Sequence, residues 1–138
     1  MGTLRIVPKE IELIYDQLDT NAINFREADG YFSIQTGVYL EEDGQLDEPQ
    51  FELNDQGNSQ FGGLRQALFS KDELTLEFAD DTPFIEKHKT VDVDLSSADI
   101  HQVVDFFANH LAMGDIIAYT ADFPDADKVE QTEKRALF

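Results

Sequence analysis

The sequence predicts an α+β fold, in which a mainly antiparallel β-sheet of about five or six strands carries one long helix on one face. Alternation of apolar and polar residues recurs along the chain, and short turns rich in Gly and Asp separate the alternating runs. One continuous apolar stripe at helical spacing lies between Ser96 and Gly114. The 138 residues include eleven Phe, so residues 1–138 are expected to form a single domain with its own core.

The segment after Pro8 is the first predicted element, and it has two interpretations. Pro8 suits the first turn of a helix. Four residues that follow have the i, i+3, i+4 and i+7 spacing of one helical face: Ile11, Ile14, Tyr15 and Leu18. A helix is therefore predicted. A strand, in which Ile11 and Leu13 alternate with polar residues, remains the alternative.

Period-two alternation between Asn21 and Leu40 predicts a strand. One face carries Phe32, Ile34, Val38 and Leu40, and the other carries Tyr31, Ser33, Gln35 and Tyr39. Asp29-Gly30 precedes the alternating residues 31–40 and Asp43-Gly44 follows them, and such dipeptides are typical of type I′ hairpin turns. Sequential strands are therefore expected to pair antiparallel.

The middle of the chain alternates between turn-rich and strand-like segments. Asn54–Gly63 is rich in turn residues and predicts a loop. Leu64–Phe69 and Glu73–Ala79 predict two strands of a hairpin. In Thr82–Glu86 a hydroxyl precedes Pro83, which predicts one short helical turn. Thr90–Leu95 alternates and predicts a strand with one buried face.

The strongest helix signal covers Ser97 to Met113. Ser96 stands three residues before Asp99, close to a capping box, and Gly114 is the expected stop. The apolar stripe consists of Ile100, Val103, Val104, Phe107 and Leu111. These side chains are expected to pack on Ile34, Val38, Leu74, Leu76, Phe78, Val91 and Val93.

The end of the chain is less well specified by its pattern. Asp115–Phe123 contains a further apolar run, which predicts either a last strand or an extension packed on the helix. The tail, residues 124–138, is expected to be a weak amphipathic helix or to be frayed.

Composition argues against several classes of partner. Twenty-nine acidic residues oppose ten Lys and Arg, and the resulting net charge of -19 disfavours nucleic acid and anionic membranes and favours a cationic partner. The chain has no Cys, which excludes disulfides and thiolate metal ligands. Its sequence contains no run of apolar residues long enough to cross a bilayer, so a cytoplasmic location is expected.

Motifs that would carry chemistry are absent from the sequence. No phosphate-binding Gly-rich loop occurs, and His88, His101 and His110 lack the i, i+4 spacing of metal ligands on a helix. His101 and Asp105 form the only local pair, and such helix-surface pairs are common. The Asp spacings near residues 92 and 122 do not fit a calcium loop. No catalytic residue, metal or cofactor is therefore predicted, and an enzyme is the minority interpretation.

Clustered carboxylates are the most distinctive feature of the surface. One group lies in residues 41–55 and another on the predicted polar faces of two strands. The candidate partner-binding residues are Glu41, Glu42, Asp43, Asp47, Glu48, Glu73, Glu77, Asp92 and Asp94. If their strands are neighbours, like charges would crowd one face unless a positive group covers it. A solvated acidic coat is an equally weighted alternative.

The stretch from Phe61 to Leu111 resembles immunity protein family ten of bacterial polymorphic toxin systems. The resemblance is carried by an aromatic-Gly-Gly entry at 61–63, two strands with Leu74, Leu76 and Phe78 on the second, an acidic alternating strand to Leu95 and a closing helix. It implies an α+β protein that neutralises a cognate toxin, and it implies no catalytic residue.

Two functions follow as hypotheses. In the first, the chain is a non-enzymatic immunity protein whose acidic surface binds a basic toxin domain, for example a nuclease, with aromatic anchors such as Tyr31, Tyr39 or Phe51. In the second, the acidity is a salt adaptation of a small-molecule-binding or structural domain. Pairing of edge strands would make a homodimer, and the sequence does not decide the oligomeric state.

Overall fold

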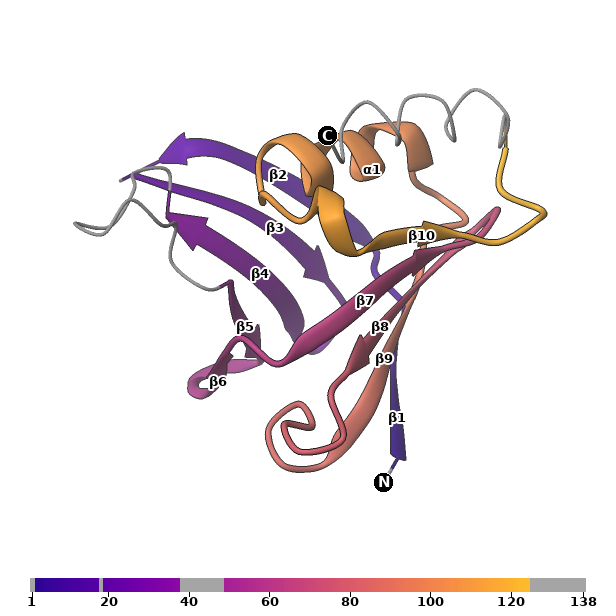
Figure 1. Cartoon of the computed structure of the whole chain (residues 1–138). Helices are drawn as coiled ribbons and strands as arrows, with labels where there is room; N and C mark the ends of the chain where they lie inside the picture. Colours follow the sequence, from indigo (N-terminus) through magenta and orange to yellow (C-terminus); the bar gives the residue numbers. More distant parts are fainter. Residues whose placement is uncertain (1, 18, 38–48, 125–138) are drawn as a thin grey trace.

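The computed structural model describes residues 2–17, 19–37 and 49–124 (Figure 1). These residues form a sheet-rich structure with one α-helix, as the α+β prediction expects. In chain order the elements are β1 (Gly2–Ile6), β2 (Glu10–Gln17), β3 (Thr20–Arg26), β4 (Tyr31–Gly37), β5 (Gln50–Leu53), β6 (Asp55–Phe61), β7 (Leu64–Phe69), β8 (Glu73–Phe78), β9 (His88–Asp94), α1 (Ile100–Asn109), the 3-10 helix η1 (Gly114–Ile116) and β10 (Ile117–Tyr119).

The described strands form two sheets, where a single sheet of five or six strands was predicted. Sheet A has the order β1-β9-β8-β7-β10, and sheet B has the order β2-β3-β4-β5-β6. The pairs β1–β9 and β10–β7 are parallel, whereas the other strand pairs are antiparallel. Each sheet has one aromatic face, and two such faces exclude water by packing on each other.

Aromatic rings from both sheets build one core. On sheet B, the Phe32 ring stacks between the Phe25 and Phe51 rings, at centroid distances of 6.1 and 6.5 Å. Phe51 meets Phe78 of sheet A edge-on at 5.1 Å. Phe84, from the β8–β9 connection, contacts both Phe32 and Phe78. Because all of these rings are fully buried, separating the sheets would expose them to water together.

The helix α1 contacts both sheets, which corrects the expected packing on one sheet face. Phe107 meets Phe69 of β7 edge-on at 5.4 Å, and Phe106 meets Tyr15 of β2 edge-on at 5.1 Å. In Figure 1, α1 accordingly lies between the upper ends of the two sheets. Ile100, Val103, Phe107 and Leu111 of the predicted stripe are buried, and Val104 is half-buried. The predicted stripe does not include Phe106, because it was predicted for a helix that packs on one sheet only.

Both predicted ends of the helix are wrong. Ser96 does not cap it, because residues 95–98 form a turn closed by the Ala98 N–H and the Leu95 carbonyl, at 3.0 Å. Asp99 is the N-cap, and its carboxylate accepts from the Gln102 N–H. The last helical residue is Asn109, and the His110 carbonyl accepts from the Asn21 amide at 2.9 Å. This contact with sheet B satisfies a carbonyl at the helix end, and the positive φ of 55° at Ala112 turns the chain before Gly114, which instead starts η1.

The segment after Pro8 is a strand, so the helical interpretation is wrong and the alternative holds. Ile11 and Leu13 face the core and pair with Phe25 and Ile23 of β3. Tyr15 contacts Phe106 of α1 and continues the alternation of Ile11 and Leu13, whereas Ile14 lies on the other face, so the helical spacing has no structural counterpart. The strand is irregular at its end, between Ile14 and Gln17. There Asp16 has a positive φ of 49°. The predicted contribution of Leu18 lies outside the described residues.

Asn54–Gly63 also forms a strand rather than a loop. The turn signals are real but they mark the two ends, since Asn54, Gly62 and Gly63 all have positive φ. The polar residues between them form β6, the edge strand of sheet B. An edge strand with one solvated face needs few apolar side chains, so its sequence resembles that of a loop.

The local hairpin predictions are confirmed where they can be compared. β3 and β4 pair around Asp29-Gly30, and β7 and β8 pair around residues 70–72. Neither Asp29 nor Gly30 has a positive φ, so the first turn is not type I′. Thr90–Leu95 falls on β9, and the strand interpretation of Asp115–Phe123 holds in β10. Val38, Tyr39, Leu40, the Asp43-Gly44 turn and the tail from residue 125 lie outside the described residues.

The β8–β9 connection contains left-handed backbone where a helical turn was predicted. Ile85 and Glu86 have φ values of 45° and 61°, a region that disfavours side chains with a Cβ. The side chain of Gln60 on β6 holds this turn, because its Oε1 accepts from the Ile85 N–H at 2.8 Å. Its Nε2 donates to the Thr82 carbonyl at 3.4 Å. A side chain of sheet B thus stabilises a strained turn of sheet A.

This strain makes a testable difference between two neighbouring exposed residues. Glu86→Gly should raise the free energy of unfolding by about 1 kcal/mol, because Gly adopts the left-handed conformation without a Cβ clash. Lys87→Gly should lower it by a similar amount, because Lys87 has no positive φ to relieve and Gly only adds entropy to the unfolded chain. Urea unfolding of both variants checks this. Equal destabilisation by both would contradict it.

Candidate interaction surface

Four of the predicted partner-binding carboxylates lie on one face of sheet A. On β8, Leu74, Leu76 and Phe78 are fully buried, so Glu73 and Glu77 point to the opposite side. On β9, Val91 and Val93 are buried, so Asp92 and Asp94 point the same way as the β8 carboxylates. We call Glu73, Glu77, Asp92 and Asp94 the acidic face.

The register of β8 and β9 brings like charges directly opposite each other. Glu73 stands across from Asp94, Thr75 across from Asp92, and Glu77 across from Thr90. Directly opposed carboxylates in an antiparallel pair repel and lower stability. The expected crowding of charge on this face is therefore present between Glu73 and Asp94.

Arg5 of β1 relieves this repulsion within the chain. β1 lies beside β9 in parallel, with Arg5 opposite Asp92. The Arg5 Nη1 atom lies 2.7 Å from Glu73 Oε2, and its Nη2 atom lies 3.8 Å from Asp94 Oδ2. The hydrogen bond to Glu73 raises the pKa of Arg5 above its ordinary value. The positive group that covers the face thus comes from the protein itself, where the sequence suggested a partner.

A second arginine pairs at the other end of the face. Arg65 Nη2 of β7 lies 2.6 Å from Glu77 Oε1. Asp94 is held charged in another way, because the Ser96 hydroxyl and N–H hydrogen-bond to it and lower its pKa. Four carboxylates face two guanidinium groups, so these six side chains carry a net charge of -2.

Two threonine hydroxyls next to the acidic face also contact each other. Thr3 Oγ1 on β1 and Thr90 Oγ1 on β9 are 2.7 Å apart. Thr75, between Glu73 and Glu77 on β8, is half-buried. Ion pairs and one hydroxyl contact thus link β1, β9, β8 and β7 along this face.

The other predicted contact residues do not belong to the acidic face. Glu41, Glu42, Asp43, Asp47 and Glu48 lie outside the described residues, as does Tyr39. Phe51 is fully buried between the sheets, so it is wrong as a surface anchor. Tyr31 is half-buried, and its hydroxyl donates to Glu52, which raises the pKa of Tyr31 to about 12.

The three histidines lie in three separate aromatic contacts. The ring of His88 lies near Phe84, that of His101 near Phe123, and that of His110 near Tyr15. Asp105, the local neighbour of His101, accepts from the Asn109 amide at 2.7 Å. In residues 2–17, 19–37 and 49–124, no group of three or more His, Asp or Glu side chains is arranged to hold a metal ion.

Arg5 and Arg65 are the members of this surface that sequence reasoning missed. Arg65 lies at the irregular pairing between Leu64 and Gln66, and simple alternation would group it with the buried Ala67 and Phe69, so the pattern gave no signal for its contact with Glu77. Arg5 had no signal either, because β1 pairs with β9 across more than eighty residues of sequence. Only the parallel pairing of β1 with β9 shows that Arg5 lies beside the acidic face.

Comparison with known proteins adds no relative to this picture. No family model, curated protein or solved structure matches the chain. The resemblance to immunity protein family ten therefore stays a prediction. Among the described residues, no helix is long and apolar enough to span a membrane.

Replacing Arg5 tests whether its positive charge offsets the repulsion between Glu73 and Asp94. Arg5→Gln should lower the free energy of unfolding by about 0.2–1 kcal/mol at low salt, because Glu73 and Asp94 then face each other without a cation. The loss should shrink in molar salt, which screens exposed charges. The control variant is Lys71→Gln, which removes one positive charge at the exposed β7–β8 turn. Equal, salt-independent effects of the two variants would contradict the assignment.

His88 makes a separate prediction about pH. Its Nδ1 atom is buried with no hydrogen-bond partner among the described residues, and this burial, followed by the charge of Lys87, lowers the pKa of His88. Near pH 6.5, His88 therefore binds a proton more readily in the unfolded chain than in the folded chain. Stability should fall as the pH drops below that value, towards the lowered pKa of the folded state.

His88→Gln should remove this loss, so that its free energy of unfolding changes less between pH 7 and pH 5.5 than that of the unsubstituted protein. Lys87→Gln should raise the pKa of His88 towards its ordinary value, because it removes a neighbouring positive charge. Denaturant unfolding and the NMR titration of the imidazole provide the two measurements. An unchanged pH dependence in His88→Gln would refute the role of His88.

Proposed function

We propose that this chain is a non-catalytic immunity protein, which binds a basic domain of a cognate bacterial toxin through the acidic face and thereby blocks it in the cytoplasm. The observation that carries the proposal is the grouping of Glu73, Glu77, Asp92 and Asp94 on one face of two paired strands of sheet A. The net charge of -19 adds a long-range attraction for a basic partner.

The ion pairs within the face support binding rather than oppose it. Arg5 and Arg65 hold Glu73 and Glu77 in fixed positions at 2.7 and 2.6 Å. A carboxylate that is already ordered loses less conformational entropy on binding than a freely rotating one. A lysine or arginine of the partner then approaches between ordered carboxylates.

Binding of this kind inhibits by covering a site. A toxin that cleaves nucleic acid carries a positive surface to hold phosphates. An acidic protein competes for that surface, because its carboxylates present negative charge as phosphates do. No bond is made or broken by the inhibitor, and its own charge speeds the encounter at low salt.

The proposal is tested by growth of cells that express both proteins. Co-expression with the cognate toxin domain, sought among the products of neighbouring genes, should restore growth. The fourfold variant Glu73→Gln, Glu77→Gln, Asp92→Asn and Asp94→Asn should protect poorly, because it leaves Arg5 and Arg65 without partners and turns the face positive. Its association rate with the purified toxin should fall at least tenfold at low salt.

A matched variant controls for net charge. Neutralising the exposed Asp29, Glu86, Asp105 and Asp115 removes the same number of carboxylates away from the acidic face. It should protect as well as the unsubstituted chain. Equal loss in both variants would assign the effect to overall charge, and full protection by the acidic-face variant would place the interface elsewhere.

A further inference from the structure

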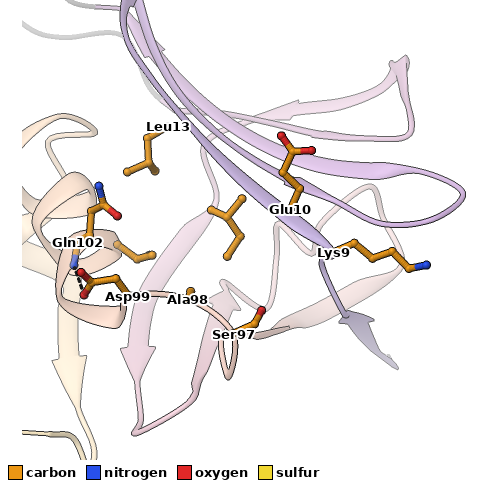
Figure 2. Close-up of a pocket in the computed structure, with 9 residues that line it drawn as sticks. Lys9, Glu10, Leu13, Ser97, Ala98, Asp99 and Gln102 are labelled. Atoms are coloured by element: carbon orange, nitrogen blue, oxygen red, sulfur yellow. Dashed lines mark hydrogen bonds between the residues drawn. The ribbon is translucent and has the colours of Figure 1, made fainter.

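The seam between β2 and α1 contains a pocket that the acidic face does not use. It has a volume of about 240 Å³ and is lined by Ile11 and Leu13 of β2, by Val103 of α1 and by Ala98 before the helix. Lys9, Glu10, Ser97, Asp99 and Gln102 form its polar rim. Figure 2 shows Leu13 on the side of β2 that faces the helix, whereas Lys9 extends away from the helix.

The size and floor of this pocket suit one apolar side chain. Binding sites for whole small molecules usually measure about 300–1,000 Å³, which is more than this pocket offers. Its floor is apolar, because Val103 is buried and Ile11 and Leu13 are half-buried. Further along the seam, the rings of Tyr15, Phe106 and His110 meet at 4.8–5.3 Å. The seam is therefore closed by aromatic contacts at one end and open at the pocket.

The strand that borders the pocket is an edge. β2 pairs only with β3 among the described strands, so its other side carries backbone N–H and C=O groups directed away from sheet B. Such an edge accepts an added strand, and alternate side chains of that strand point to the face on which Ile11 and Leu13 lie. An unpaired edge and an apolar pocket thus lie together between a strand and a helix.

We propose that this seam binds an extended segment of a partner protein, which adds as a strand to β2 and places one aliphatic side chain in the pocket. The segment carries lysine or arginine next to that side chain, because the Asp99 carboxylate lies on the helix side of the pocket, whereas Glu10 and Lys9 lie on the far side of β2 (Figure 2). Main-chain hydrogen bonds supply affinity and the pocket supplies selectivity. This site is distinct from the acidic face, which belongs to the other sheet.

The probe is a short acetylated peptide in which valine and lysine alternate, added at physiological salt to the isotopically labelled full chain. Backbone amide signals of Ile11, Leu13, Gln102 and Val103 should shift on addition of the peptide. A peptide of the same sequence with alternate backbone nitrogens methylated keeps the side chains and charges but loses donors. It should bind at least tenfold more weakly, and so should a peptide with serine in place of valine.

Matched variants locate the site. Ser97→Phe places a ring at the rim of the pocket and should weaken binding about tenfold or more. Asn58→Phe adds the same ring on β6, the opposite edge of sheet B, and should leave binding unchanged. The dispersion of the amide spectrum reports that each variant is folded.

Several outcomes would overturn the proposal. Equal binding of the methylated or serine peptide would show that neither strand addition nor the pocket is used. Shifts of backbone amide signals confined to residues 73–94 would show that the basic peptide binds the acidic face instead of the pocket. Failure of this test leaves the growth experiment untouched, because that experiment changes only carboxylates of sheet A.

Discussion

The packing of two aromatic sheet faces on each other is the constraint on which the rest of the structure depends. Phe25, Phe32 and Phe51 of sheet B meet Phe78 and Phe84 of sheet A in one buried cluster. Neither sheet could remain folded with such a face in water. Covering it commits the outward faces of both sheets to polar residues, and it leaves the space between their upper ends to α1.

The acidic face follows from this arrangement. Since Leu74, Leu76, Val91 and Val93 must point inward, the carboxylates between them are forced to the outside and against each other. The parallel strand β1 then places Arg5 where the repulsion is greatest. The alternation of apolar and acidic residues on β8 and β9 therefore determines both the core packing and the surface charge. The carboxylates of the acidic face are positioned by the chain before any partner binds.

Local signals account for the parts that could be predicted. The hairpins around residues 29–30 and 70–72, strand β9 and most of the helix stripe follow from neighbouring residues, whose alternation and turn chemistry act over a few positions. β2 and β6 were misjudged because edge strands obtain half of their environment from solvent. Of the candidate site, the grouping of Glu73, Glu77, Asp92 and Asp94 was predictable, whereas Arg5 was not.

By itself, the sequence determined which residues alternate, where the chain turns and that its surface is strongly acidic, because these properties depend on neighbours in the chain. Tertiary structure decided that there are two sheets, that β1 lies beside β9 and that α1 ends where Asn21 bonds the His110 carbonyl. Each of these depends on the contact of segments distant in sequence. Such contacts form only when burial of the shared core outweighs the entropy of closing long loops.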